Sequence, residues 1–179
     1  MTIPRPMRAD ARRNRDAIVA AARSAFDRNE QLRFDDFAAR AGVGVGTLYR
    51  HFPTREALAA AVYEGEVTAL CDQARDPARS ARENLEAFLR GFVDYLVDHA
   101  GLVLTFAAIV HPAIQADGGS ELERTVADLV TRATADGSIR EGIVPGALLI
   151  VLHGIGSATD RPMWAAESRA AVELLIAGL

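Results

Sequence analysis

The sequence contains no lysine and a single cysteine among its 179 residues. One thiol, Cys71, excludes both a framework of disulfides and a cysteine-based zinc module. Residues 1–15 are rich in arginine and lack the apolar stretch of a secretory signal, so we expect a cytoplasmic protein. The chain is 50% hydrophobic and 25% charged, which excludes a disordered tail or a collagen-like fibre.

Segment 142–159 has no charged residue and resembles a membrane span at first sight. It contains Pro145 and four glycines, and its strongly apolar part, 147–152, is too short to cross about 30 Å of hydrocarbon. We therefore predict a helix buried on more than one side, and no membrane partner.

Charge is unevenly divided along the chain. Residues 1–55 hold eleven arginines and six acidic residues, a net charge of +5, whereas residues 56–179 hold nine arginines and eighteen acidic residues, a net charge of −9. A basic first third on an acidic remainder suggests a head that faces a polyanion. Solvated helix faces that fall unevenly explain the same counts, so charge alone leaves both interpretations open.

Apolar residues recur with the 3.6-residue period of helices, and the alternation typical of strands is absent. The sequence thus predicts an all-α fold of about nine helices. The helices that can be placed are about 12–28, a short one after Asp35, 45–51, one from Thr54 towards Arg75, one after Asp76, one after Ser120, and two at about 145–158 and 162–177. Polar side chains suited to N-caps begin four of them: Asp35, Thr54, Asp76 with Pro77 in the first turn, and Ser120 in a capping box with Glu123.

Residues 41–55 join two short helices through a glycine-containing turn, which is typical of a helix-turn-helix. Gly42, Gly44 and Gly46 supply the small residues that let the two helices cross at a steep angle. Leu48 and Phe52 are expected to point back into the core of this head.

The second short helix, 45–51, has to fit a DNA groove about 12 Å wide if it reads sequence. Thr47 and Arg50 are placed for base edges or phosphates, and Tyr49 and His51 for phosphate oxygens. Thr54 and the first backbone amides of the next helix form a further anion site, with Arg55 beside it.

Residues 41–58, AGVGVGTLYRHFPTREAL, resemble the DNA-binding signature of TetR-type bacterial transcriptional regulators, A-G-V-S-x-G-T-L-Y-x-H-F followed by K-E-x-L. The resemblance covers about residues 12–62, since Ile18, Ala22, Phe26 and the segment 35–38 match the first two helices. It implies a three-helix, homeodomain-like head joined to a C-terminal helical bundle. It also implies a dimeric regulator that leaves a palindromic operator when a small-molecule effector binds.

The chain departs from this signature in several places. Gly44 stands where the family has Ser or Thr as the helix cap, which costs a few tenths of a kcal/mol, and a possible phosphate contact is lost. Arg55 replaces a lysine and keeps the charge, with a fork for phosphate. Phe37 replaces a common Ile, and the loop 29–34 is about one residue short. These changes leave the operator sequence open.

The resemblance implies three parts: a DNA-binding domain over 1–53, a connecting helix over 54–75, and an effector-binding and dimerisation domain over 76–179. The residues that it assigns to DNA contact are Arg40, Gly44, Val45, Gly46, Thr47, Tyr49, Arg50, His51, Thr54 and Arg55. The residues that it suggests for an effector cavity are Phe92, Tyr95, Phe106, His111, His153 and Trp164. The last two helices are apolar over much of their circumference, and we expect them to form the homodimer interface.

Other interpretations remain open for several residues. Arg12, Arg13 and Arg15 form either a solvated helix face or a basic arm that touches the duplex. His99, His111 and His153 lie on three segments without ligand spacing, so we predict no metal site, and no cofactor.

A small helical enzyme or ligand carrier with an incidental helix-turn-helix is the alternative function. No G-x-S-x-G elbow, Walker loop, H-E-x-x-H motif or Cys–His pair appears in the sequence, which is why we expect no enzyme. A nonspecific architectural DNA binder fits poorly with the acidic remainder of the chain.

Overall fold

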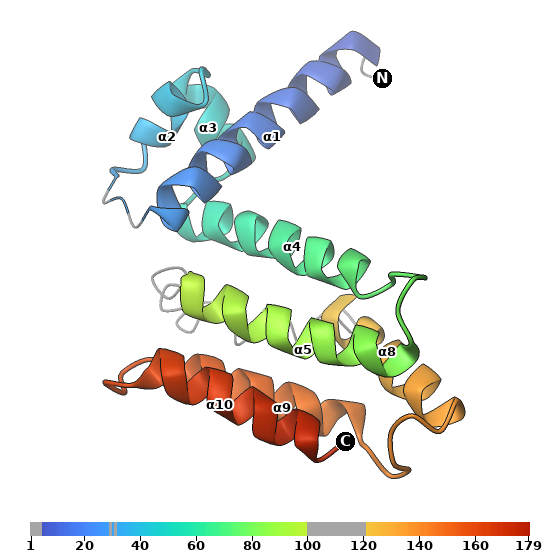
Figure 1. Ribbon diagram of the computed structural model, residues 1–179. Coiled ribbons are helices and arrows are strands. Elements are labelled where there is room, and N and C mark those ends of the chain that lie inside the picture. Colours follow the sequence, from blue (N-terminus) through green and yellow to red (C-terminus); the bar gives the residue numbers. More distant parts are fainter. Residues whose placement is uncertain (1–4, 29, 31, 100–120) are drawn as a thin grey trace. The chain divides into compact units, whose positions relative to one another are not determined.

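A computed structural model describes residues 5–28, 30, 32–99 and 121–179, without the side chains of residues 5–8 and 27. All regular secondary structure in these ranges is helical, as the periodicity predicts, and the described residues form eight helices, labelled in Figure 1. They are α1 (Arg5–Asp27), α2 (Asp36–Arg40), α3 (Val45–His51), α4 (Arg55–Gln73), α5 (Ala81–Asp98), α8 (Glu121–Ala135), α9 (Pro145–Ser157) and α10 (Trp164–Ala177).

The chain divides into two compact units, residues 1–64 and residues 65–179. The boundary falls inside α4, so the first half of that helix belongs to the first unit and the second half to the other.

The first unit is built on contacts of α1 with α2 and α3, and of α2 with α3. Ile18 and Ala22 of α1, Phe37 of α2 and Leu48 of α3 have no exposed surface, because the apolar spacing of each helix turns them to a common core. Phe52 is 3% exposed at the end of α3, where the following proline stops the helix. The inward positions predicted for Leu48 and Phe52 are therefore confirmed.

Helix α1 is longer than the sequence predicts. It begins at Arg5 rather than near Arg12, and Ala9 to Arg13 are all exposed. Burial starts only near Ile18, so apolar periodicity gives no signal for the first turns.

The second unit is organised around α5, which contacts α8, α9 and α10. The apolar residues of α5 that recur with helical spacing in the sequence are buried; they are Leu85, Phe88, Leu89, Phe92 and Leu96. The same holds for Leu122, Val126, Leu129 and Ala133 of α8. Trp164 at the start of α10 is buried, and its indole N–H donates to the carbonyl oxygen of Ile155 in α9 over 2.7 Å.

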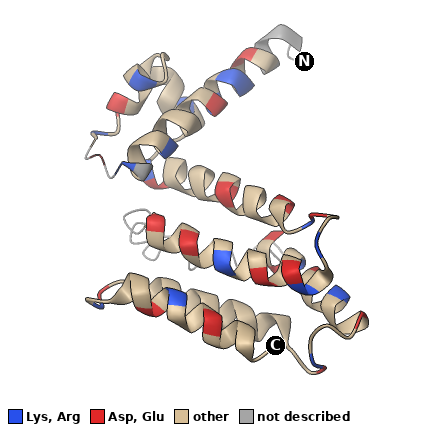
Figure 2. Ribbon diagram, in the orientation of Figure 1, with Lys and Arg blue, Asp and Glu red and all other residues tan. Residues whose placement is uncertain are grey.

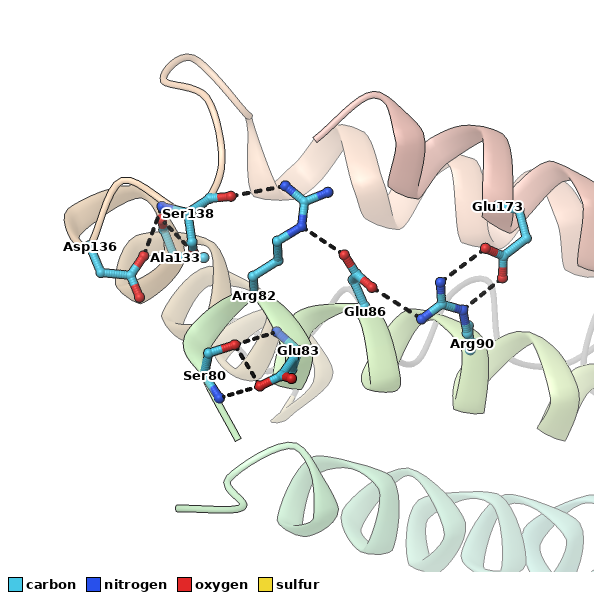
Figure 3. Close-up of polar contacts among 9 residues, drawn as sticks. All are labelled: Ser80, Arg82, Glu83, Glu86, Arg90, Ala133, Asp136, Ser138 and Glu173. Atoms are coloured by element: carbon cyan, nitrogen blue, oxygen red, sulfur yellow. Dashed lines mark hydrogen bonds and ion pairs between the residues drawn. The ribbon is translucent and has the colours of Figure 1, made fainter. Parts of the chain in front are cut away.

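Helix α5 begins later than predicted. Asp76 and Pro77 lie in a turn, in which the Asp76 carboxylate accepts from the backbone N–H of Ala78 over 2.9 Å. The cap is Ser80, whose hydroxyl accepts from Glu83 N while the Glu83 carboxylate accepts from Ser80 N (Figure 3). The prediction that Asp76 caps this helix was wrong, because a reciprocal capping box at Ser80 satisfies two backbone donors.

Other predicted caps have different outcomes. Thr54 accepts from Ala57 N over 3.2 Å and caps α4 as predicted. Asp35 occupies the N-cap position of α2, but its side chain makes no capping bond, so that part of the prediction was wrong. The backbone N–H of Arg33 is bound instead by Asp36, at 2.9 Å. The capping box proposed at Ser120 lies outside the described residues.

A chain of charged side chains joins α5 to its neighbours in the second unit (Figure 3). Arg82 binds the carbonyl oxygen of Ser138 and the carboxylate of Glu86, and Glu86 also pairs with Arg90. Arg90 then holds Glu173 of α10 with two hydrogen bonds of 2.7 and 2.9 Å. This paired geometry lowers the pKa of Glu173, and it fixes α10 against α5 at the surface.

Candidate DNA-binding site

The solvent-exposed face of α3 carries apolar, aromatic and basic side chains. Val45 is 46% exposed and Tyr49 is 45% exposed, and Arg50 is also exposed. No hydrogen bond or ion pair joins the Arg50 side chain to another described residue. The guanidinium is therefore available to an acceptor outside the chain, in the position from which a helix in the major groove contacts bases.

The remaining side chains of α3 are less exposed than those of that face. Leu48 is buried against the core, whereas Thr47 and His51 are half-buried. Thr47 lies in the first turn of α3, where its short side chain stands beside the amino end of the helix.

The turn before α3 depends on one glycine rather than three. Gly42 has φ +68°, a left-handed conformation that side chains with a Cβ rarely adopt. Gly44 is the N-cap of α3 with φ −72° and ψ 147°, an extended conformation open to other residues. Gly46 lies within the helix. The prediction that all three glycines serve the turn was therefore wrong for Gly44 and Gly46.

Tyr49 is tied to the segment before α2. Its hydroxyl donates to Asp35 Oδ1 over 2.9 Å, and its ring lies edge-on to Phe34 with centroids 5.2 Å apart. The hydrogen bond to the carboxylate raises the pKa of the Tyr49 phenol, which keeps it protonated. This contact also explains why the Asp35 side chain does not cap α2.

Arg40 at the end of α2 is paired rather than free. Its guanidinium binds the carboxylate of Glu30, which also accepts from Arg28 Nε over 2.6 Å. Hydrogen bonds from Arg40 and then from Arg28 lower the pKa of Glu30. One acidic side chain thus neutralises part of the positive charge near α2.

Arg55 is turned towards the interior of the first unit. Its guanidinium donates to the carbonyl oxygen of Leu32 and lies 5.7 Å from the ring centroid of Phe26 and 5.4 Å from that of Phe37. Cation–π contact of this kind stabilises packing. In this structure Arg55 acts as a packing group, and its predicted contact with phosphate stays a prediction.

The amino end of α4 retains anion-binding character. Thr54 is exposed beside the first turn of the helix, whose dipole attracts negative charge, while the N–H of Ala57 is already bound by the Thr54 side chain. Glu56 in the same turn has a lowered pKa, because its own backbone N–H and the Thr54 side chain bond to its carboxylate.

The described residues suggested for an effector cavity differ from one another in burial. Phe92 and Tyr95 of α5 and Trp164 of α10 are buried, whereas His153 of α9 is exposed. Phe106 and His111 lie outside the described residues. His99 is half-buried at the end of α5, with Nδ1 2.9 Å from the carbonyl oxygen of Tyr95.

Helices α9 and α10 expose an apolar surface. Ile150 of α9 is 73% exposed and Leu174 of α10 is 77% exposed. Figure 2 shows no charged residue on α9. Within the single chain α9 packs against α5 and α8 and exposes the side that carries Ile150, so its burial on more than one side stays a prediction.

A shallow groove of about 320 Å³ continues this surface. It is lined by residues of α9, of α10 and of the segment before α9, among them Val144, Ala147, Val151, Leu174 and Leu175. None of the four described residues suggested for an effector cavity, Phe92, Tyr95, His153 and Trp164, lines it.

The described part of the chain contains neither a membrane-spanning helix nor a cluster of metal ligands. None of its helices combines the length and apolar character needed to cross a membrane. Within the same ranges, no three His, Cys, Asp or Glu side chains gather as a metal site would require.

Comparison with known proteins places these features in a family. Residues 18–62 match the bacterial regulatory proteins of the tetR family, and residues 76–179 match the C-terminal domain of SbtR-like transcriptional regulators. The second match alone covers more than half of the chain. The chain belongs to the TetR family of transcriptional regulators. The TetR resemblance predicted from residues 41–58 is therefore confirmed, and the matched family consists of regulators rather than enzymes.

Individual TetR-family proteins are similar over most of the chain. A TetR regulator from Streptomyces coelicolor, SCO0520, is 34% identical, with a TM-score of 0.65 and coverage of 92% of this chain and 97% of its own. A TetR regulatory protein from Mycobacterium vanbaalenii is 31% identical, with a TM-score of 0.68 and coverage of 97% and 99%.

A curated sequence relative matches a shorter stretch. The HTH-type transcriptional regulator SAR2658 of Staphylococcus aureus is 30% identical over 102 residues, which are 54% of this chain and 55% of that protein. The alignment with this relative thus spans about half of each protein.

Proposed function

We propose that this TetR-family protein binds a palindromic operator as a homodimer and acts as a repressor released by a small-molecule effector. The exposed face of α3, on which Arg50 has no partner among the described residues, carries this proposal. A recognition helix places its amino-terminal residues against base edges. Thr47 and Arg50 then read bases, while Tyr49, His51 and the amino end of α4 contact phosphate.

The proposed division of labour follows three segments of the sequence. Residues 1–53 bind DNA, 54–75 connect, and 76–179 bind the effector and dimerise. Twofold pairing through α9 and α10 would cover the exposed side chains of Ile150 and Leu174 and the adjoining groove. It would also supply two recognition helices for half-sites about 34 Å apart.

Release by an effector requires two states of the dimer with different half-site separations. The effector favours one state only through its differential affinity for the two. In our proposal it binds in the second unit, near the buried side chains of Phe92, Tyr95 and Trp164, and the shift reaches the heads through α4. A small change of separation removes phosphate contacts at both half-sites.

The decisive experiment selects bound fragments from genomic DNA with the full-length protein and measures their affinity by gel shift. We expect a palindromic site, bound with an affinity that falls steeply as salt concentration rises. Binding no fragment at low ionic strength would overturn the proposal and favour a carrier. Equal affinity for random DNA would favour an architectural binder.

Two variants then test the assignment of α3. Arg50→Ala removes a base or phosphate contact and is expected to weaken operator binding by about 10- to 100-fold. The matched control is Arg132→Ala on α8, which removes the same charge from the second unit, where Arg132 pairs with Asp128 at 3.2 Å. Equal affinities of both variants and the wild type would show that α3 does not read the operator.

A further inference from the structure

The first turns of α1 form a helical extension that adds nothing to the core. Ala9 to Arg13 are exposed, and the first fully buried side chain of α1 is Ile18. Figure 1 shows this half of α1 projecting beyond its contacts with α2 and α3 in the first unit. A helix that buries no apolar face gains little stability from packing, so packing does not account for the residue types found in these turns.

Charge on the extension is mainly positive. Residues 5–16 contain five arginines and two aspartates. The carboxylate of Asp10 is paired with the guanidinium of Arg13, three positions further along the helix. Arg12 makes no hydrogen bond or ion pair with another described residue. Arg12 and Arg15 are three residues apart and share one side of the helix, and of the two aspartates only Asp16 is left to oppose them, so the described side chains of this side keep a net positive charge.

The same side of α1 lies beside the end of α3. The Arg15 guanidinium carbon is 5.5 Å from the ring centroid of Phe52, the residue that ends α3. This stacking uses the flat face of the guanidinium and leaves its N–H groups to other acceptors. Arg12 lies one turn further out on the same side, so the basic surface continues from α3 along α1.

We propose that Arg12 and Arg15 bind phosphates of the duplex beside the groove that α3 occupies. The proposal rests on the proposed function, because α3 must first lie in a groove. Duplex DNA is the occupant that fits, since it supplies a row of phosphates along a surface continuous with α3, and guanidinium groups match phosphate geometry. The contacts add affinity and fix orientation without reading sequence.

The test compares Arg12→Gln, the double variant Arg12→Gln/Arg15→Gln, and the control Arg13→Gln, all on the operator fragment selected by the wild type. Arg13→Gln removes the same charge from the same helix, but from a side chain already paired with Asp10. Affinity is measured at several salt concentrations, on the operator and on an unrelated duplex of equal length. Thermal unfolding of each variant is recorded as a check on folding.

We expect the double variant to bind both duplexes about tenfold more weakly at low salt. The slope of log affinity against log salt should be reduced by about 4, because two arginines are removed from each of the two heads of the proposed dimer. Arg12→Gln is expected to show about half of that loss of slope and an unchanged melting temperature, because its side chain supports no contact in the fold. Arg13→Gln is expected to stay within about twofold of the wild type.

Phosphate ethylation interference locates the contacts. The wild type should depend on backbone phosphates that the double variant ignores. The inference would be overturned if the double variant kept the DNA affinity and the salt slope of the wild type. It would also be overturned if Arg13→Gln lost as much affinity and slope as the double variant. Either result would leave operator binding by α3 intact. Failure of the wild type to bind any DNA would instead overturn the proposed function.

Discussion

The Tyr49 hydroxyl donates to Asp35 Oδ1 over 2.9 Å, which links the exposed face of α3 to the residue before α2. A phenol has one O–H to donate. In the DNA-free protein that donor is engaged, so a phosphate has to replace the carboxylate before Tyr49 donates to it. Asp35 thus competes with the phosphate and places a negative charge near the proposed DNA surface.

Asp35→Asn is expected to strengthen binding to operator and to unrelated DNA by about two- to fivefold at low salt. The substitution removes one charge that repels the phosphate backbone, while the amide oxygen still accepts from Tyr49. Gel shifts on both duplexes measure the effect. The control is Glu64→Gln on α4, an exposed residue with the same change of charge. Weaker binding by Asp35→Asn would show that the carboxylate helps to place α3.

Arg55→Ala is expected to lower the free energy of unfolding of the first unit by about 1–2 kcal/mol. The variant removes the cation–π contacts with Phe26 and Phe37 and the hydrogen bond to Leu32. Denaturant unfolding followed by circular dichroism measures the change. Arg12→Ala, which removes an exposed arginine, is the control. Unchanged stability of Arg55→Ala would assign this residue to the surface and favour its predicted contact with phosphate.

The capping box of α5 gives a pH-dependent prediction. Hydrogen bonds from the backbone and then the side chain of Ser80 lower the pKa of Glu83. A lowered pKa contributes stability above the ordinary value of the carboxyl, about 4.3, and that contribution is lost as pH falls through the lowered value. Wild type and Glu83→Gln should therefore differ in thermal stability at pH 7 and converge in acid.

Ser80→Ala removes the other half of the same box and is expected to cost about 1 kcal/mol of unfolding free energy at pH 7. Asp76→Ala, which removes the cap favoured by the sequence, should cost less, because Asp76 caps only a turn. A larger loss in Asp76→Ala than in Ser80→Ala would contradict the placement of the helix start.

Charge placed on the face of α9 and α10 is expected to separate the proposed dimer. Ile150→Glu and Leu174→Glu each put a carboxylate on a side chain that is more than 70% exposed in the single chain, so neither should impair folding. Sedimentation analysis should show a monomer for these variants and a dimer for Ala135→Glu, an exposed position of α8. Dimers in all three would place the interface elsewhere.

The thiol of Cys71 is expected to be unreactive in the native protein. It has no exposed surface, and burial raises its pKa, so little thiolate is present at neutral pH. A chromogenic disulfide reagent should titrate one thiol only after denaturation. Fast reaction in native buffer would show that α4 opens at this position.

Much of the fold was predictable from local patterns. The bounds of α3 follow from the glycines before it and the proline after it, and the inward residues of α5 and α8 follow from 3.6-residue spacing. The family followed from residues 41–58, because many positions recur there at fixed spacing. These signals reside within a few turns of chain, where local chemistry dominates.

The sequence did not predict in the same way which side chains bind each other. Several polar groups compete for one site, and only packing decides which of them meet. Asp35 has the chemistry of a cap but binds Tyr49, and Arg55 has the chemistry of a phosphate ligand but packs against the rings of Phe26 and Phe37. Asp76 and Ser80 are both suitable caps, and the reciprocal bonds between Ser80 and Glu83 place the start of the helix at Ser80.

The sequence by itself determined an all-helical chain of the TetR family with a recognition helix at 45–51, because helix periodicity, turn residues and motif spacing are local properties. The tertiary structure alone decided which arginines are free. Arg50 and Arg12 remain without a partner among the described residues, whereas Arg40 pairs with Glu30 and Arg55 packs inward. A guanidinium is satisfied by whichever carboxylate, carbonyl or ring the folded chain brings within reach, and that depends on residues distant in sequence.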